Sequence, residues 1–194
     1  MEFLPLGISG AWHVRSVVHR DDRGEFTEWF RIDRLEEHTG HRFEVAQANL
    51  SRSARGVVRG IHFADVPPGQ AKLVTCVSGA IRDIVVDLRV GSPTFGQWEA
   101  VDLSSETRDA VVLPVGVGHG FVALTDDTLV AYLVSDVFKP HAEHGVHPLD
   151  ETLAIDWVLP AEQLLLSPKD RQAPTFDEAH RLGMLPGFDG GHGR

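Results

Sequence analysis

The sequence predicts an all-β fold, a sandwich or barrel of short strands with a few short helices at its periphery. Short apolar runs fill the middle of the chain, turn-forming residues separate these runs, and helical periodicity is scarce. The length of 194 residues suits one domain. We therefore predict a single domain over residues 1–194, whose glycine-rich tail from about 187 to 194 is flexible.

The predicted strands begin at residues 45–50, where alternation places Gln47 and Asn49 on one face. Turn sequences such as Pro67-Pro68-Gly69 and Gly91-Ser92-Pro93 mark the ends of strands. Further strands are predicted, in chain order, at residues 57–63, 72–77, 81–88, 98–103, 111–113, 120–124 and 128–134. Helices are predicted only at residues 32–39 and 175–182, so the pattern does not fit alternating β and α units.

Composition limits the classes of partner. The hydrophobic content of 42% is enough for a core, and the net charge of −10 disfavours nucleic acid and anionic membrane as partners. An anionic ligand would need a local basic pocket. The single cysteine, Cys76, excludes an intrachain disulfide. Because the chain also lacks a signal-peptide pattern and an apolar run of membrane-spanning length, we predict a cytoplasmic protein.

The apolar run at residues 57–63 contains two polar side chains, Arg59 and His62. Burying either side chain without partners is costly. The run therefore either lies at a solvated edge or lines a cavity that needs a cation and a titratable base. Strict alternation would send residues three apart to opposite faces, but Gly60 lies between them. A bulge at this glycine would bring both side chains into one cavity.

Of the 11 histidines, His62 and His119 are the two that lie in apolar segments. The run from Pro114 to Phe121 resembles the second half-motif of cupin barrels, in which the histidine often binds a metal. Metal-binding cupins supply two alternate histidines and a glutamate from an earlier strand, whereas here that strand reads His62-Phe63-Ala64. We therefore predict no metal. The alternative role of His119 is a structural histidine with satisfied hydrogen bonds.

Several different short motifs occur along the chain in a distinctive order. They are Asp22-Arg23-Gly24-Glu25-Phe26 with Glu28, Gln47 with Asn49, Arg59-Gly60-Ile61-His62, Gln70-Ala71-Lys72-Leu73-Val74, Val86-Asp87-Leu88-Arg89, Gly91-Ser92-Pro93-Thr94-Phe95-Gly96, Pro114 to Phe121, Tyr132, Glu143 and Ser167-Pro168-Lys169-Asp170. Each motif alone is weak, but their order and spacing are specific. Over roughly residues 4–186 the chain resembles the dTDP-4-keto-6-deoxyglucose 3,5-epimerases of the rhamnose pathway and their relatives in antibiotic deoxysugar pathways.

The resemblance implies a cupin-like jelly roll, also called a double-stranded β-helix, commonly a homodimer that exchanges N-terminal strands. It implies no metal and no redox cofactor. The implied substrate is a dTDP-4-keto-6-deoxyhexose. In the implied reaction a proton leaves the carbon beside the C4 ketone, and a proton returns on the opposite face.

The resemblance also assigns the catalytic roles. His62 is the base, and Asp170, in a segment that otherwise reads as a polar surface loop, holds its imidazole. Lys72, assisted by His119, stabilises the enolate oxygen. Tyr132, the single tyrosine, is the acid on the far face.

The remaining assignments concern substrate binding. Arg23 and Arg59 bind the diphosphate, because guanidinium groups suit phosphate oxygens. Phe138 stacks on the thymine. The nucleotide and sugar pocket is lined by Glu28, Gln47, Asn49, Glu143 and Lys169.

The chain departs from the family at His62-Phe63-Ala64, where members often read His-Tyr-Gln. The pair Ala64-Asp65 before Val66-Pro67-Pro68-Gly69-Gln70, together with Trp29-Phe30, resembles the antibiotic-sugar branch, in which some members invert only C3 or only C5. Inversion at both carbons and inversion at one carbon therefore remain alternatives. Three other functions remain as rivals: a ketoisomerase of the same architecture, a sugar-binding cupin without catalysis, and a metal-dependent cupin oxygenase.

Overall fold

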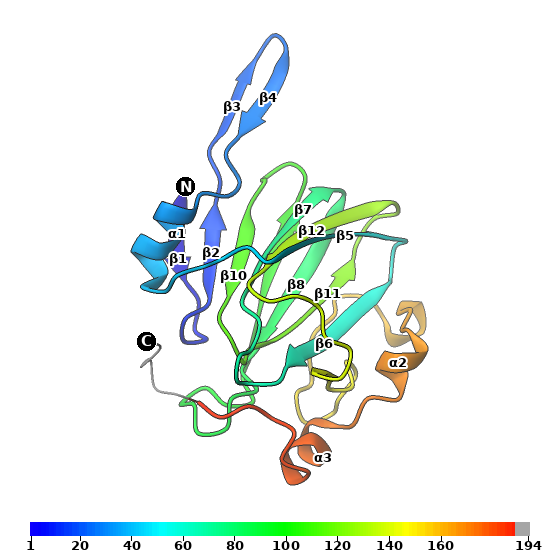
Figure 1. The fold of residues 1–194 in the computed structure, drawn as a ribbon. Coiled ribbons are helices and arrows are strands. Elements are labelled where there is room, and N and C mark those ends of the chain that lie inside the picture. The colour runs from blue at the N-terminus through cyan, green and yellow to red at the C-terminus, as the bar shows by residue number, and fades with distance from the viewer. Residues whose placement is uncertain (189–194) are drawn as a thin grey trace.

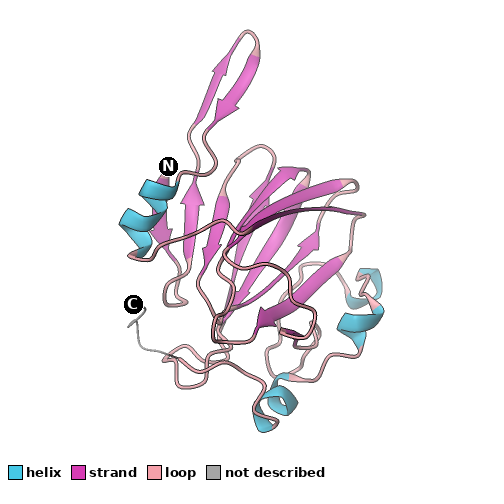
Figure 2. Cartoon of the chain, viewed as in Figure 1, coloured by secondary structure: helices cyan, strands magenta, loops and turns pink. Residues whose placement is uncertain are grey.

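Strands are the main regular secondary structure of the computed structural model, which describes residues 1–188 (Figure 1). Helices are few and short, and they lie at the periphery (Figure 2). The predicted all-β class is confirmed. The strands are β1 (Glu2–Pro5), β2 (Trp12–Arg15), β3 (Val18–Asp21), β4 (Gly24–Thr27), β5 (Gln47–Ser53), β6 (Val58–Ala64), β7 (Lys72–Ser78), β8 (Ala80–Val86), β9 (Trp98–Ser104), β10 (Ala110–Leu113), β11 (Gly118–Ala123), β12 (Thr128–Val134) and β13 (Glu143–Gly145).

The strands form two antiparallel sheets and a separate hairpin. The six-stranded sheet has the order β1-β2-β10-β7-β12-β5, and the five-stranded sheet has the order β13-β6-β11-β8-β9. Strands β3 and β4 pair only with each other and project away from both sheets (Figure 1). All eight predicted strands are present, and their ends differ from the prediction by at most three residues. The missed strands β1, β2, β3, β4 and β13 have only three or four residues each, too few for alternation to stand out.

Two of the three α-helices in the described part of the chain lie where the sequence predicts them, and one was not predicted. Helix α1 spans Ile32–Thr39 as predicted, and α3 spans Phe176–Arg181 within the predicted range. The segment expected to be a polar loop instead contains α2, Pro168–Arg171, which Ser167 caps by accepting the backbone N–H of Asp170. A short 3₁₀ helix, Ala161–Gln163, precedes it. None of the helices in residues 1–188 has the length and apolar character needed to cross a bilayer.

One apolar core lies between the two sheets. Inward-facing side chains of the six-stranded sheet, including Val74 and Val130, meet those of the five-stranded sheet, including Val85 and Phe121. A separate cluster on the outer face of the six-stranded sheet packs against α1 through Leu35. These apolar side chains fill part of the space between the two sheets. A cavity between the sheets can therefore lie only beside this core.

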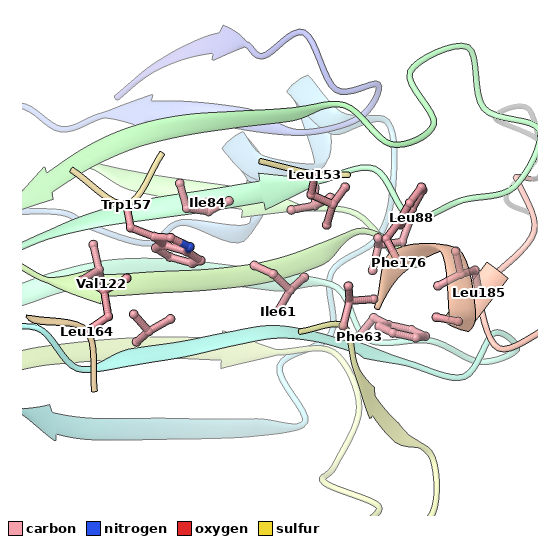
Figure 3. Packing of buried hydrophobic residues seen from close by; sticks show 14 residues of the cluster. Ile61, Phe63, Ile84, Leu88, Val122, Leu153, Trp157, Leu164, Phe176 and Leu185 are labelled. Carbon is pink, nitrogen blue, oxygen red and sulfur yellow. The ribbon is translucent and has the colours of Figure 1, made fainter. Parts of the chain in front are cut away.

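A second core lies on the outer face of the five-stranded sheet, where the C-terminal segment covers it (Figure 3). Trp157 and Phe176 pack in one cluster with Ile61, Phe63 and Ile84 of the sheet. The Trp157 indole also donates a hydrogen bond to the carbonyl of Pro148 at 2.8 Å. This packing fixes the segment that carries α2 beside β6.

The predicted tail lies mostly outside the described residues. Within them, Gly187 forms a bridge with Val90, and the Phe188 backbone N–H donates to the Val90 carbonyl at 2.9 Å. The expected fraying of residues 189–194 falls outside the described part of the chain.

Candidate active site

A cavity of about 450 Å³ opens between the two sheets and the C-terminal segment. Its wall combines aliphatic and aromatic side chains with a set of ionisable groups. The lining residues come from β6 and the residue before it, from β7, β11 and β12, and from α2 and the segment that leads into it: Val57, Val58, Arg59, His62, Lys72, His119, Phe121, Tyr132, Leu165, Leu166, Ser167, Lys169 and Asp170.

A bulge in β6 brings Arg59 and His62 to this one cavity. His62 pairs with His119 of β11 and Arg59 pairs with Phe121, so three steps along β6 match two steps along β11. Gly60 occupies the irregularity with φ of 136°. A Cβ atom added there would lie 2.4 Å from the Cα of Gly120. The predicted bulge is confirmed, and only glycine fits it.

His62 and Asp170 form a hydrogen-bonded pair although 108 residues separate them in the chain. The His62 Nε2 atom lies 2.7 Å from Oδ1 of Asp170, which is buried. Burial raises the pKa of the Asp170 carboxyl, but hydrogen bonds from His62 and Ser167 outweigh burial and hold that pKa below its ordinary value. An ionised carboxylate at this position accepts from Nε2–H and leaves Nδ1 as the basic nitrogen.

Lys72 begins β7 and is buried, in contrast to the solvated strand-end lysine that its position alone would suggest. Burial lowers the pKa of its ammonium group, while the carboxylates of Glu143 and Asp83 act in the opposite direction. Glu143 lies on β13, where it pairs with Ala64 of β6. The two acidic residues thus partly compensate the cost of a cation in the cavity wall.

His119 also has a carboxylate partner. Its Nε2 atom lies 2.8 Å from Oδ2 of Asp83, and both side chains are buried. The other oxygen of Asp83 has no hydrogen-bond partner within residues 1–188. His119 therefore both lines the cavity and has a satisfied hydrogen bond. Asp83 was not predicted from the sequence. It could have been, because Asp83 is a polar residue within the apolar run 81–88, as His62 is within the run 57–63.

Tyr132 approaches the cavity from the six-stranded sheet, whereas His62 lies on the five-stranded sheet. Its neighbours in the ladder are Asn49 of β5 and Val74 of β7. Burial raises the pKa of the Tyr132 hydroxyl; Arg59 lowers it and Glu143 raises it by smaller amounts. The hydroxyl is therefore protonated at neutral pH.

Three further predicted binding residues lie along the edge of the six-stranded sheet. Gln47 donates to Asn49 Oδ1 at 2.7 Å and accepts from the backbone N–H of Phe138 at 2.9 Å. The Phe138 side chain is 56% exposed. Asn49 pairs with Tyr132 in the β5–β12 ladder, and none of the three residues is part of the cavity lining, whereas Lys169 is.

Arg23 and Glu28 do not lie in the cavity of their own chain. The β3–β4 hairpin projects away from both sheets (Figure 1). Arg23 is at the turn of this hairpin, where its guanidinium group contacts the Asp21 carboxylate at 2.6 Å. Glu28 follows β4 and lies 4.0 Å from Arg31. No group of three His, Cys, Asp or Glu side chains within residues 1–188 is arranged to hold a metal ion.

The fold and the cavity define a class of protein: a jelly-roll enzyme whose pocket presents a histidine–carboxylate pair, a buried lysine and a tyrosine. Residues 5–178 match the family model described as dTDP-4-dehydrorhamnose 3,5-epimerase. The chain belongs to this family, which is an isomerase family, and the predicted cupin-like architecture is confirmed with it.

Individual relatives are similar over almost the whole chain. The dTDP-4-dehydrorhamnose 3-epimerase of Streptomyces niveus is 54% identical over 97% of this chain and 90% of its own length. The dTDP-4-dehydrorhamnose 3,5-epimerase of Mycolicibacterium smegmatis is 51% identical over 93% and 89% of the two chains. The crystal structure of NovW, a 4-keto-6-deoxy sugar epimerase from the novobiocin cluster of Streptomyces spheroides, superposes with a TM-score of 0.94 at 54% identity, covering 97% of this chain and 94% of that chain.

Proposed function

We propose that this protein inverts carbon C3 of a dTDP-4-keto-6-deoxyhexose by removing and returning a proton beside the C4 ketone. The central support is one cavity with a histidine–carboxylate pair on one sheet and a tyrosine on the other. The names of the three relatives specify different carbons: the Streptomyces niveus protein is a 3-epimerase, the Mycolicibacterium smegmatis protein is a 3,5-epimerase, and the name of NovW specifies no carbon. C3 is common to the two that name positions, and additional inversion at C5 is the alternative that labelling in heavy water decides.

In the first step His62 removes the proton. Asp170 accepts from Nε2–H, so the lone pair of Nδ1 is available for the substrate C–H. When Nδ1 takes the proton the imidazole becomes a cation, and the adjacent carboxylate stabilises it. The electron pair of the C–H bond moves into the enolate, whose charge develops on the former C4 oxygen.

Lys72 and His119 are the groups proposed to stabilise that oxygen. Both are buried in the cavity wall. The Lys72 ammonium group is a donor as it stands, whereas His119, whose Nε2–H is engaged by Asp83, can donate to that oxygen from Nδ1 only in its cationic form. Fixed donors in a site shielded from water stabilise a developing oxyanion by several kcal/mol, of order ~3 kcal/mol each. The carboxylates of Glu143 and Asp83 act to raise the pKa of Lys72, against the larger effect of burial.

In the second step Tyr132 returns a proton to the opposite face of the carbon. Its raised pKa keeps the hydroxyl protonated, as an acid requires. The base and the acid belong to different sheets, so a sugar held between them can lose a proton on one side and receive one on the other. This arrangement gives inversion of configuration without a change in oxidation state.

Binding of the nucleotide is assigned to the cations at the cavity and to the edge of the six-stranded sheet. Arg59 and Lys169 provide positive charge for the diphosphate in a protein whose net charge is −10. Gln47, Asn49 and the exposed ring of Phe138 form a surface suited to a pyrimidine base.

The protein is further proposed to act as a homodimer in the cytoplasm. The β3–β4 hairpin projects away from its own cavity and carries Arg23, with Glu28 just beyond it. In a dimer that exchanges this hairpin, Arg23 and Glu28 would reach the cavity of the partner subunit. The Arg23 guanidinium group could there bind a phosphate of the substrate. Sedimentation of the wild-type protein at micromolar concentration tests this; a monomer would contradict it.

The decisive experiment offers dTDP-4-keto-6-deoxyglucose to the protein in heavy water and counts deuterium at C3 and C5 by NMR and mass spectrometry. The expected result is deuterium at C3 with inverted configuration, and label at C5 as well would identify double inversion. A moved carbonyl would identify a ketoisomerase. Binding without any exchange would identify a sugar-binding cupin, and loss of activity after metal removal would favour a metal-dependent enzyme.

A further inference from the structure

Two different residues hold the two oxygens of the Asp170 carboxylate. Oδ1 contacts Nε2 of His62 at 2.7 Å, and Oδ2 accepts the Ser167 hydroxyl, also at 2.7 Å. The same hydroxyl oxygen accepts the Asp170 backbone N–H at 3.0 Å. Because this N–H occupies a lone pair of the Ser167 oxygen, the hydroxyl hydrogen is directed to Oδ2. Each oxygen of the carboxylate therefore has its own hydrogen-bond partner, which fixes the orientation of the carboxyl group.

The backbone of Ser167 is itself fixed relative to the strand that carries His62. Leu165 donates to the Gly56 carbonyl at 2.8 Å and accepts the Val58 N–H at 3.0 Å, in a parallel bridge with Val57. At Gly56 a Cβ atom would lie 2.2 Å from the carbonyl oxygen of Gln163, so the two segments are in close contact. The chain then enters α2 through Pro168, whose ring fixes the backbone after Ser167.

We infer that Ser167 is a positioning residue that acts through Asp170 to hold His62 in the tautomer with its hydrogen on Nε2. By occupying Oδ2, the Ser167 hydroxyl stops the carboxylate from rotating and leaves Oδ1 to face the imidazole. A fixed Nε2–H keeps Nδ1 unprotonated. The catalytic part of this inference rests on the proposed function, whereas the effect on the tautomer does not.

Loss of the Ser167 hydroxyl should let His62 exchange between its two neutral tautomers. The form with the hydrogen on Nδ1 cannot accept a proton from substrate. Outer partners of histidine–carboxylate pairs in metal sites contribute about 10- to 100-fold to activity. For Ser167→Ala we expect kcat to fall on the order of tenfold, with KM changed by less than about twofold, because ground-state binding is little affected.

The test compares three variants with the wild type. Ser167→Ala removes the hydroxyl, and Ser167→Thr retains it. Thr175→Ala is the matched control, because Thr175 caps α3 through its side chain but does not contact the His62–Asp170 pair. For each protein, the His62 tautomer is read from two-bond ¹H–¹⁵N correlation spectra, and kcat, KM and the thermal midpoint are measured.

The expected result is a single Nε2–H tautomer in the wild type and Ser167→Thr, a mixed tautomer with reduced kcat in Ser167→Ala, and an unchanged tautomer and kcat in Thr175→Ala. An unchanged tautomer in Ser167→Ala overturns the inference, as does an equal loss of kcat in Thr175→Ala. If the wild type exchanges no substrate hydrogen, the proposed function fails, while the spectra still decide whether Ser167 positions His62.

Discussion

His62 and His119 are direct neighbours across the β6–β11 ladder, yet each bonds a different carboxylate. His62 bonds Asp170 from the C-terminal segment, and His119 bonds Asp83 from β8. Two histidine–carboxylate pairs therefore lie side by side in one cavity wall, with separate supports. This separation allows the proposed base to be removed without disturbing the second pair.

Replacing His62 by alanine should abolish deuterium incorporation at the sugar carbons. A general base contributes about 10²- to 10⁴-fold, so we expect a loss of at least ~10²-fold. His144→Ala is the matched control, because His144 bonds Asp65 at 2.6 Å and is not part of the cavity lining. Substantial exchange in His62→Ala would refute the assignment of the base.

Replacing Tyr132 by phenylalanine should impair proton return more than proton removal. Substrate deuterated at C3 would then lose its label faster than inverted product appears, because a solvent proton can return from the His62 side. The measurement is the ratio of the washout rate to the inversion rate. If Tyr132→Phe forms inverted sugar at the wild-type rate, another group is the acid.

Replacing Lys72 by methionine should inactivate the protein and stabilise its fold. Because burial lowers the pKa of Lys72 in the folded state, the unfolded chain binds the proton more tightly, and the charged lysine opposes folding below that pKa. At pH 7 we expect a gain of ~1 kcal/mol in the free energy of unfolding. Urea titrations should show this gain shrinking as pH approaches about 10.4, the ordinary lysine value. A gain independent of pH would contradict a cost that arises from the buried charge.

Replacing Gly60 by alanine should destabilise the fold by more than ~2 kcal/mol, because the new Cβ meets the Gly120 backbone at 2.4 Å. Gly24→Ala is the matched control, since φ is 129° at Gly24 and 136° at Gly60, but nothing lies within 4 Å of a Cβ at Gly24. We expect the control to lose only the cost of an unfavourable φ, roughly 1 kcal/mol. Equal losses in urea titrations would show that backbone strain alone accounts for the requirement for glycine.

Replacing Arg59 by alanine should weaken binding of dTDP about tenfold, the loss expected from one charge-assisted contact of roughly 1.5 kcal/mol. Arg82→Ala serves as the control, because Arg82 pairs with Asp102 and Asp156 and does not line the cavity. Calorimetry measures both affinities. Unchanged affinity in Arg59→Ala would count against a phosphate role.

Eight of the eleven strands described in the two sheets could be predicted, because their apolar patterns and flanking turns are local in sequence, whereas the short strands β1, β2 and β13 were missed. The β6 bulge could also be predicted, since a glycine between two polar residues in an apolar strand is typical of a break in the alternation. The His62–Asp170 pair came only from the family resemblance, because no local pattern joins residues 108 positions apart. The pairing of Asp83 with His119 depends on strand order, which the sequence did not determine, and Arg23 was placed by resemblance in a pocket that its own hairpin does not reach.

The packing of the C-terminal segment has a consequence for biosynthesis. Trp157, Leu164 and Phe176 anchor the segment that delivers Asp170, and all of them leave the ribosome after the last strand of the barrel. A nascent chain can therefore complete its barrel while His62 still lacks its partner. Catalytic competence would appear only with the last part of the chain, because the same segment also completes the cavity wall and delivers Lys169.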